Sequence, residues 1–496
     1  MRTSLALNFL NIQNQELKNI LKFEENFNVD EWKILGLRIW PYIRISLSTA
    51  WVNKLNTINA EKTFLYKKSK YQSRLASIVR KVNSLKFYFS FLIRFASAFN
   101  NSSYPVISSS TKLTTGIFGF DVDRVHTDKG YYNRYSDSLI ETGIIEEDKC
   151  IHFERCLLGS RTPFRPFVDI THYYWLSALL GWVLVPIFVL TVRLNPEISN
   201  AYAWCVSNSL DGSALKTRNI IFTYLTLRVQ RELYKHLISK YRLNKVIKVG
   251  WYDVDGMALA WACNRAGIPF VDIQHGMAGA NNHRAYSCWS KIPLAGYELL
   301  PSDYWCWSKV DADSIIDWYI YLNTYKSDKV RIIGIPFANY ALTTSFNELF
   351  SCDEEINFLL SLTQKYRHTV IVSLAEEIPQ IIIEAIKGSH LDIFWLIRYH
   401  PTLISKLDKI KSEIASLNNT EIYHSSTLPL YALLKICSCN ITEWSATFFD
   451  ASAMKVPTIF VSGMALTSFP EFLSSGEALF ADSPVSLLSA IRNLPQ

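Results

Sequence analysis

Acidic and imidazole side chains follow two apolar runs in the middle of the chain. Asp253 and Asp255 come just after the run at 245–250, and the run at 270–274 leads into Gln274, His275 and Gly276. A carboxylate can act as a nucleophile, an imidazole can bind an anion or move a proton, and glycine lets a ligand approach the backbone. Each group also has a structural alternative, because an aspartate can cap the following helix and a loop histidine can simply support the fold.

Two further polar groups follow apolar runs in the last quarter of the chain. Hydroxyls and backbone amides at the start of a helix bind phosphate, and a carboxylate one turn later can accept both hydroxyls of a ribose. An ordinary N-cap is the alternative for the serine in this region. The residues in these two groups are Arg398, His400 and Pro401, and Ser445, Ala446, Thr447 and Asp450.

Alternating strand-like and helix-like segments position these groups from about residue 104 onward. The strand-like runs lie at 105–109, 117–120, 151–155, 245–250, 270–274, 330–334, 368–374, 393–398, 440–442 and 458–461, and the clearest helical segments at 219–241 and 256–265. Strand–helix–strand units of this length form parallel sheets, which bind ligands beyond the carboxyl ends of their strands. The pattern therefore predicts an α/β protein with two doubly wound, Rossmann-like domains.

The order and spacing of the polar motifs resemble a family of sugar transferases. His400-Pro401 and the Ser-x-Thr turn at Ser445 resemble the CMP-binding motifs of bacterial CMP-sugar glycosyltransferases of the GT-B architecture, which include sialyltransferases and Kdo transferases. The motif Asp272-Ile-Gln-His-Gly276, the segment 283–286 and Gly334-Ile-Pro336 look most like the retaining β-Kdo transferase modules of O-antigen and capsule assembly. The resemblance covers roughly residues 104–490 and leaves residues 1–100 unmatched.

The resemblance implies a donor, an acceptor and a donor site. The donor would be CMP-Kdo, in which Kdo is 3-deoxy-D-manno-octulosonic acid, and the acceptor a lipid-linked surface glycan, with neither a cofactor nor a metal. Arg398 and His275 are candidates for the sugar carboxylate or the phosphate, since charge-assisted contacts suit such anions. By resemblance, His400 and Pro401 would contact the cytidine and phosphate, Ser445, Ala446 and Thr447 the phosphate, and Asp450 the ribose.

Retention of the anomeric configuration implies a double displacement through an enzyme carboxylate. Asp255 is the first candidate for this nucleophile and Asp253 the second. Glu154 is the candidate base for the acceptor hydroxyl, although it can instead form an ion pair with Arg155 or Arg161. The chain only approximates the acid-acid-glycine motif of sialyltransferases in Asp253-Val-Asp255-Gly256, which favours Kdo over sialic acid as the donor sugar.

Other assignments stay open from sequence alone. A transferase that uses UDP or GDP sugars, or one that resembles glycerol-phosphate polymerases, would share the two-domain plan, whereas a non-catalytic polysaccharide-assembly scaffold would bind no nucleotide. The Tyr-rich segment 120–137 is expected on the acceptor side. A plain surface hairpin with a turn at Lys129-Gly130 is its alternative.

Charge divides the chain into a basic end and a slightly acidic body. The 496 residues are 49% hydrophobic and carry a formal net charge of +7. Residues 1–100 hold 16 Lys/Arg and 6 Asp/Glu, so residues 101–496 carry a net −3, which argues against a nucleic-acid partner. We expect a basic helical extension at 1–100, an acceptor and catalytic domain at 101–315, and a nucleotide-sugar donor domain at 316–496.

Two segments predict contact with a membrane. Residues 62–94 contain nine Lys/Arg and no acid, a pattern typical of a helix on anionic lipid headgroups, or alternatively of a solvated helix with one packed side. Residues 173–192 carry no charge and are long enough to cross a bilayer, but Pro186 interrupts them and a span would divide the site. Scattered cysteines and an N-terminus unlike a signal peptide favour a cytoplasmic protein, peripheral to the inner membrane.

Overall fold

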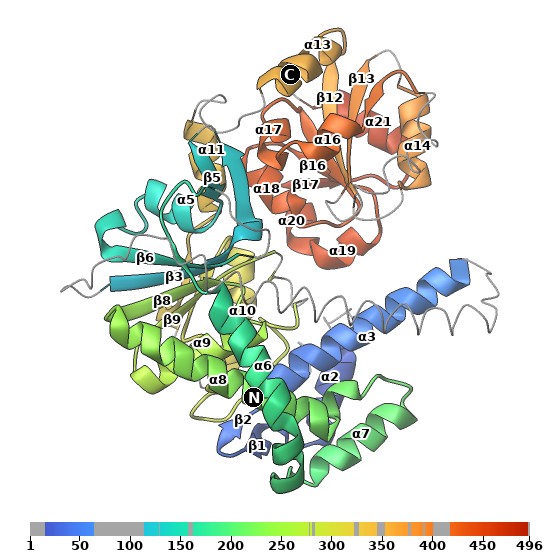
Figure 1. Ribbon diagram of the computed structural model, residues 1–496. Coiled ribbons are helices and arrows are strands. Elements are labelled where there is room, and N and C mark those ends of the chain that lie inside the picture. Colours follow the sequence, from blue (N-terminus) through green and yellow to red (C-terminus); the bar gives the residue numbers. More distant parts are fainter. Residues whose placement is uncertain are drawn as a thin grey trace, which may run out of the picture.

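Two parallel β-sheets, each in its own domain, organise the protein (Figure 1). The computed structural model describes residues 15–63, 114–127, 129–156, 162–276, 278–279, 283–321, 327–344, 353–374, 378–389, 392–399 and 417–494. The basic segment 62–94 and the strand-like run at 105–109 lie almost wholly outside the described residues. Structural statements below concern the described residues only.

The first sheet has seven strands in the order β11-β10-β9-β8-β3-β6-β7, each parallel to its neighbours. Successive strands spread outward from β3 on one side and from β8 on the other. The strand order therefore reverses between β3 and β8, and such a switch point is where doubly wound sheets bind ligands. The strands are β3 (Thr114–Phe120), β6 (Cys150–Arg155), β7 (Val168–Asp169), β8 (Leu243–Val249), β9 (Phe270–Ile273), β10 (Asp303–Cys306) and β11 (Val330–Ile332).

Helices cover both faces of the first sheet, because neighbouring residues of each strand point to opposite sides. Phe118 and Val246 face a core shared with α8 and α9, whereas Ile117 and Ile247 face a smaller core that contains Leu139 of α5. α6 packs on the outer side of α8. The helices are α5 (Ser136–Glu141), α6 (Thr171–Thr191), α7 (Glu197–Ser207), α8 (Thr217–Lys240), α9 (Val254–Ala266) and α10 (Lys309–Tyr321).

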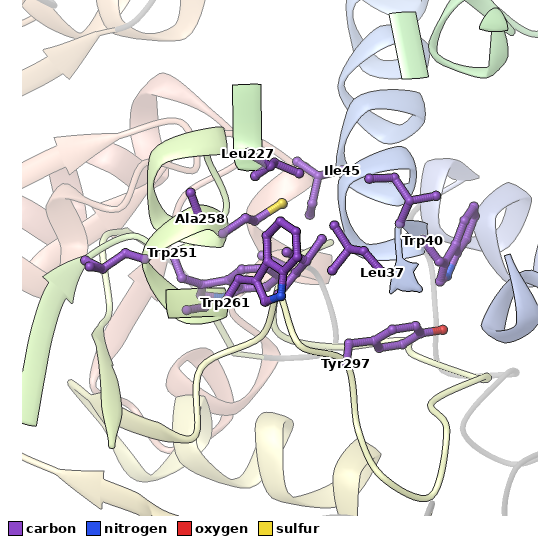
Figure 2. Close-up of a cluster of buried hydrophobic side chains, with 14 of the residues drawn as sticks. Leu37, Trp40, Ile45, Leu227, Trp251, Ala258, Trp261 and Tyr297 are labelled. Carbon is purple, nitrogen blue, oxygen red and sulfur yellow. The ribbon is translucent and has the colours of Figure 1, made fainter. Parts of the chain in front are cut away.

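The N-terminal segment is built into the first domain. It consists of α2 (Gln15–Asn26), the short strands β1 (Lys33–Ile34) and β2 (Leu37–Arg38), and α3 (Trp40–Thr63). Trp40 and Leu37 lie in the same buried cluster as Trp251, Trp261 and Tyr297 (Figure 2). The described part of the predicted basic extension therefore contributes core side chains to this domain.

The second sheet has six parallel strands in the order β14-β13-β12-β15-β16-β17, again with a switch point, here between β12 and β15. Its strands are β12 (His368–Leu374), β13 (Ile393–Tyr399), β14 (Thr420–Glu421), β15 (Cys439–Thr442), β16 (Thr458–Phe460) and β17 (Ala478–Phe480). The described helices around it are α13 (Asp353–Thr363), α14 (Gln380–Lys387), α16 (Tyr423–Thr427), α17 (Leu430–Leu434), α18 (Thr447–Ala453), α19 (Met464–Ser468), α20 (Pro470–Ser474) and α21 (Pro484–Arg492).

A hairpin and one helix join the two domains. The hairpin of β4 (Arg124–Thr127) and β5 (Gly130–Asn133) leaves the first sheet after β3, and α11 (Pro336–Thr343) follows β11. Tyr132 stacks on Tyr340 of α11 with ring centroids 5.0 Å apart, and Phe337 of α11 packs 4.6 Å from Tyr431 of α17. The domain boundary expected at residue 315 falls inside α10. The first domain extends beyond this helix, because β11 still belongs to the first sheet.

The secondary structure confirms the predicted fold class. The expected strands at 245–250, 368–374 and 393–398 are β8, β12 and β13, and the expected helices at 219–241 and 256–265 are α8 and α9. The segment 173–192 is helical as α6, the one described helix that is long and apolar enough to cross a membrane. Residues 124–133 of segment 120–137 form a hairpin, as in its alternative assignment, but Tyr132 and Asn133 are buried, so it is not a plain surface hairpin.

Candidate functional site

The loops after β3, β8 and β9 meet at the switch point of the first sheet. A 3₁₀ turn, Asp121–Asp123, follows β3, the turn at 250–253 follows β8, and Gln274 to Gly276 follow β9. Gly276 has a φ of +91°, a left-handed conformation that favours glycine. A Cβ on Gly256 would lie 2.4 Å from the Trp251 carbonyl oxygen, so glycine is required where this turn enters α9.

The two aspartates after β8 have different environments. Asp253 is the N-cap of α9, since its Oδ1 accepts a hydrogen bond of 2.6 Å from the Gly256 amide, and it stays partly exposed. Asp255 is only 5% exposed and accepts a hydrogen bond from the Tyr234 hydroxyl of α8. Burial raises the pKa of Asp255 and the nearby Asp253 charge raises it further. Asp255, the first candidate nucleophile, is therefore enclosed between α8 and α9, whereas Asp253 faces the edge of the sheet.

Lys248 supplies a buried positive charge beneath this turn. It lies near the end of β8, is 1% exposed, and its Nζ is 3.2 Å from Asp253 Oδ1 and donates to the Gly250 carbonyl at 3.0 Å. The ammonium also lies 4.7 Å from the Phe120 ring centroid. The buried ammonium therefore forms an ion pair with the Asp253 carboxylate beneath the turn.

His275 and Gln274 follow β9 but serve different purposes. The His275 Nδ1 and the Tyr135 hydroxyl are hydrogen-bonded at 2.8 Å, and Tyr252 donates to the His275 carbonyl at 3.3 Å. Part of the imidazole stays open to solvent. The buried Gln274 side chain instead accepts from the Trp307 amide and donates to the Gly276 carbonyl, both at 2.8 Å. Gln274 therefore shapes the loop that carries His275.

Glu154, the candidate base, is enclosed by the hairpin. It lies at the end of β6, where Arg124 donates from Nε at 2.9 Å and Asn133 donates at 3.0 Å. Burial raises its pKa to about 7, against the opposing charge of Arg124. Glu154 is thus part of an ion pair, the predicted alternative to catalysis, although its partner is Arg124 rather than Arg155 or Arg161.

The second domain contributes the turn that follows β15. Ser445 Oγ accepts a hydrogen bond of 3.3 Å from the Thr447 amide, but the N-cap of α18 is Ala446, so Ser445 lies one residue before the cap position expected as its alternative. Thr447 Oγ1 is buried and has no hydrogen-bond partner among the described residues. Ala446 packs at the edge of the core that contains Phe448 and Phe449. His400 and Pro401 lie outside the described residues.

Asp450 is the polar centre of this half of the site. It accepts a hydrogen bond from the Tyr431 hydroxyl of α17. Burial raises the pKa of Asp450, while Tyr431, Arg134 and Arg398 oppose that shift. Arg398 donates to the carbonyls of Ser425 and Leu428 at 2.8 and 2.6 Å, and burial lowers its pKa to about 10. Arg398 therefore holds β13 to the helices that follow β14 and places a charge near Asp450.

Arg134 connects the two halves of the site. It follows β5 in the first domain, and its guanidinium lies 3.8 Å from Asp123 Oδ1. Burial opposes ionisation, but Tyr135, Asp123 and Asp450 together raise the pKa of Arg134. Burial also raises the pKa of Asp123, against the charges of His275, Arg134 and Lys248. The structure thus brings Asp450, Arg398 and His275 together with Arg134, Asp123 and Tyr135, which sequence reasoning had not singled out.

Sequence signals for the missed residues are weak but present. Lys248 stands between the apolar residues Ile247 and Val249 of β8, a place where a lysine is seldom buried unless it is paired. Arg134 and Asp123 belong to the polar segment 120–137 that was assigned as a whole rather than by residue. The described residues contain no cluster of three or more His, Cys, Asp or Glu side chains arranged for a metal ion.

The fold defines the class: an α/β protein with two Rossmann-like domains, each built on a parallel sheet with a switch point. No protein-family model matches the sequence, and no curated protein matches it. Among solved structures, UDP-GlcNAc 2-epimerase from Neisseria meningitidis bound to UDP-GlcNAc is similar with 11% identity and a TM-score of 0.45, over 76% of this chain and 91% of that chain.

Two more solved structures show the same level of similarity. UDP-GlcNAc 2-epimerase from Methanocaldococcus jannaschii has 11% identity and a TM-score of 0.45, over 77% of this chain and 92% of that chain. The wall teichoic acid polymerase TagF has 11% identity and a TM-score of 0.40, over 84% of this chain and 89% of that chain. At these TM-scores the fold assignment rests on the two strand orders described above.

Proposed function

We propose that the protein is a GT-B glycosyltransferase that moves Kdo from CMP-Kdo to a lipid-linked surface glycan with retention of configuration. The observation that carries this proposal is the packing of the hairpin before Arg134 through Phe337 onto Tyr431, which places the Arg134 charge near enough to Asp450 and Tyr431 of the second domain for them to raise its pKa. In this proposal, residues from both domains contact the same CMP-Kdo molecule. Arg134 can contact an anionic group of the donor directly, and the charges of Arg398 and Lys248 behind it favour a donor that carries both a phosphate and a sugar carboxylate.

The donor contacts follow from the resemblance and from the free polar atoms. Thr447 Oγ1, buried and unpartnered among the described residues, can donate to a phosphate oxygen. Ser445 and Ala446 flank it, Asp450 would receive the ribose hydroxyls, and His400 with Pro401 would contact the cytidine. In this proposal Arg134 takes the sugar carboxylate, because the Arg398 guanidinium already serves the carbonyls of Ser425 and Leu428.

The reaction we propose has two displacements. An Asp253 carboxylate oxygen attacks the anomeric carbon, and the bond from that carbon to the phosphate oxygen breaks as CMP leaves with the electron pair. The acceptor hydroxyl then attacks the same carbon, its proton passes to His275, and the bond to Asp253 breaks. Asp253 replaces Asp255 in this role because Asp255 is enclosed, and His275 replaces Glu154 for the same reason.

Nucleotide binding tests the donor assignment. We expect isothermal titration calorimetry to show that CMP binds at least about tenfold more tightly than UDP or GDP, a difference of about 1.4 kcal/mol. Arg134→Ala should weaken CMP-Kdo binding by about tenfold or more, since a charge-assisted contact is lost. Arg265→Ala is the control, because this exposed arginine ends α9 at the opposite edge of the sheet. Preference for UDP or GDP would identify another nucleotide-sugar transferase, and no nucleotide binding at all would favour a scaffold.

The pH dependence of transfer tests the role of His275. Partial removal from water lowers the pKa of His275 below its ordinary value of 6.5; Arg134 and Lys248 lower it further, and Asp123 opposes them. A base is active when neutral, so kcat/KM should fall as pH drops through this lowered pKa, with a midpoint below 6.5. Asp123→Asn removes the opposing charge and should move the midpoint to still lower pH. A midpoint that rises in Asp123→Asn would contradict this role.

A further inference from the structure

One side of α6 exposes a continuous apolar surface. The other side packs on α8, where a Cβ at Gly181 would lie 2.7 Å from Thr226 Oγ1, so the two helices are in close contact. Ser177 and Val185 are buried along this contact. The outward side chains include Trp182, Val183, Ile187 and Leu190, which are 56%, 52%, 58% and 87% exposed. An apolar surface of this kind marks a binding surface.

A basic hollow lies at the C-terminal end of this helix. Its volume is about 690 Å³, and Arg193 and Lys216 line it together with apolar side chains such as Ile198 and Leu215. No acidic residue is among its lining residues in the described chain. The nearby Glu197 carboxylate is occupied, because it accepts a hydrogen bond of 2.7 Å from Trp32 Nε1. The hollow therefore has the charge and size to receive an anionic phosphate headgroup.

The chain around α6 favours a helix that lies on a bilayer over one that crosses it. Ile170 precedes α6 and Ile198 follows it, and both belong to the same buried cluster as Val185 in the middle of the helix. α6 also packs on α8, a helix that contributes to the same core. A crossing helix would have to leave this core, whereas an interfacial helix keeps it intact.

We infer that α6 docks the protein on a lipid bilayer, with Trp182, Ile187 and Leu190 in the acyl boundary and Arg193 and Lys216 on anionic headgroups. A bilayer fits both features at once, because the apolar face carries no charged group and the adjoining hollow carries only positive ones. This surface is separate from the basic segment 62–94 and does not depend on the nature of the nucleotide sugar.

Vesicle flotation with paired variants tests the inference. The full chain should float with phosphatidylcholine vesicles that contain phosphatidylglycerol, and less with phosphatidylcholine alone. The double variant Ile187→Glu/Leu190→Glu should reduce partitioning by at least about tenfold, as two buried apolar side chains are lost. Arg193→Glu/Lys216→Glu should reduce it by about tenfold on anionic vesicles and leave neutral vesicles unchanged. Val485→Glu, an exposed apolar residue of α21, should have no effect.

Hydrogen exchange on the unaltered protein gives an independent measurement. Anionic vesicles should slow amide exchange in peptides that cover 180–195, while exchange in α21 stays the same. The inference would be overturned if Ile187→Glu/Leu190→Glu floated as well as the wild type, or if amide exchange at 180–195 were unchanged in a protein that floats. Either result would assign membrane attachment to another segment such as 62–94. Absence of flotation by the wild type would overturn it too. CMP binding, measured in parallel, reports on the proposed function separately.

Discussion

Replacing Asp253 by asparagine should lower kcat for sugar transfer by at least about a thousandfold, because an amide cannot form the glycosyl ester. The protein should remain folded, since asparagine is as good an N-cap as aspartate and can still accept from the Gly256 amide. Incubation of the wild type with CMP-Kdo alone should add the mass of one sugar to a peptide that covers 251–265. The same incubation of Asp253→Asn should add nothing.

Asp255→Asn is the matched control for this experiment. The two aspartates are two residues apart, and the substitution makes the same chemical change. The amide oxygen introduced by Asp255→Asn can still accept from the Tyr234 hydroxyl, so activity should stay within about threefold of wild type. Stability should stay the same or rise, since a buried carboxylate with a raised pKa is replaced by a neutral group. Loss of activity in Asp255→Asn with activity retained in Asp253→Asn would return the nucleophile to Asp255.

The enclosure of Asp255 could have been predicted from helical periodicity. In α9, Asp255 lies three and four residues before Ala258 and Leu259 and seven before Ala262, all of which are buried. Positions with this spacing share one face of a helix, and that face was apolar. The N-cap position of Asp253 follows from the sequence as well, because aspartate is a favoured N-cap and the helical segment expected at 256–265 begins three residues after it.

The strands and the residues at their ends follow from local sequence, but the meeting of the two domains does not. Apolar runs bounded by glycine or proline identify β8, β9 and β13, and the apolar run at 368–374 identifies β12. The rule that ligands bind at strand ends selects His275 and Asp450. Arg134 comes near enough to Asp450 to affect its pKa because the hairpin packs through Tyr132 on α11, which is about two hundred residues further along the chain. Contacts over such separations depend on tertiary packing rather than on any local pattern.

The N-terminal segment shows how net charge can hide a core element. Residues 1–100 are strongly basic, yet the excess lies at 62–94, whereas Trp32, Trp40 and Trp51 precede it and are fully buried. Three tryptophans within twenty residues indicate a packed segment more directly than the total charge does. What these residues pack against could not be predicted, because some of their partners, such as Glu197 for Trp32 and Asp211 for Trp51, lie about 160 residues further along the chain.

Arg44 of α3 and Glu24 of α2 form an ion pair in which both side chains are fully buried. We expect the loss of this pair to be the most destabilising change in the N-terminal segment. Arg44 Nε lies 3.0 Å from Glu24 Oε1, and its Nη2 donates to the carbonyls of Ser287 and Cys288 at 3.1 and 2.6 Å. Glu24 also accepts from Trp40 Nε1 at 3.0 Å. The pair thus ties the N-terminal segment to the loop between β9 and β10.

Arg44→Ala should lower the free energy of unfolding by about 3–5 kcal/mol, because it leaves the Glu24 carboxylate buried without its positive partner. The exposed pair between Arg492 and Asp392, 2.6 Å apart, offers the control, and Arg492→Ala should cost less than about 1 kcal/mol. Urea unfolding curves of the two variants measure both values. Arg44→Ala should also speed amide exchange at 284–290, in the same loop between β9 and β10 that carries His275. Equal losses of unfolding free energy in the two variants, with unchanged exchange at 284–290, would show that Arg44 does not secure this loop.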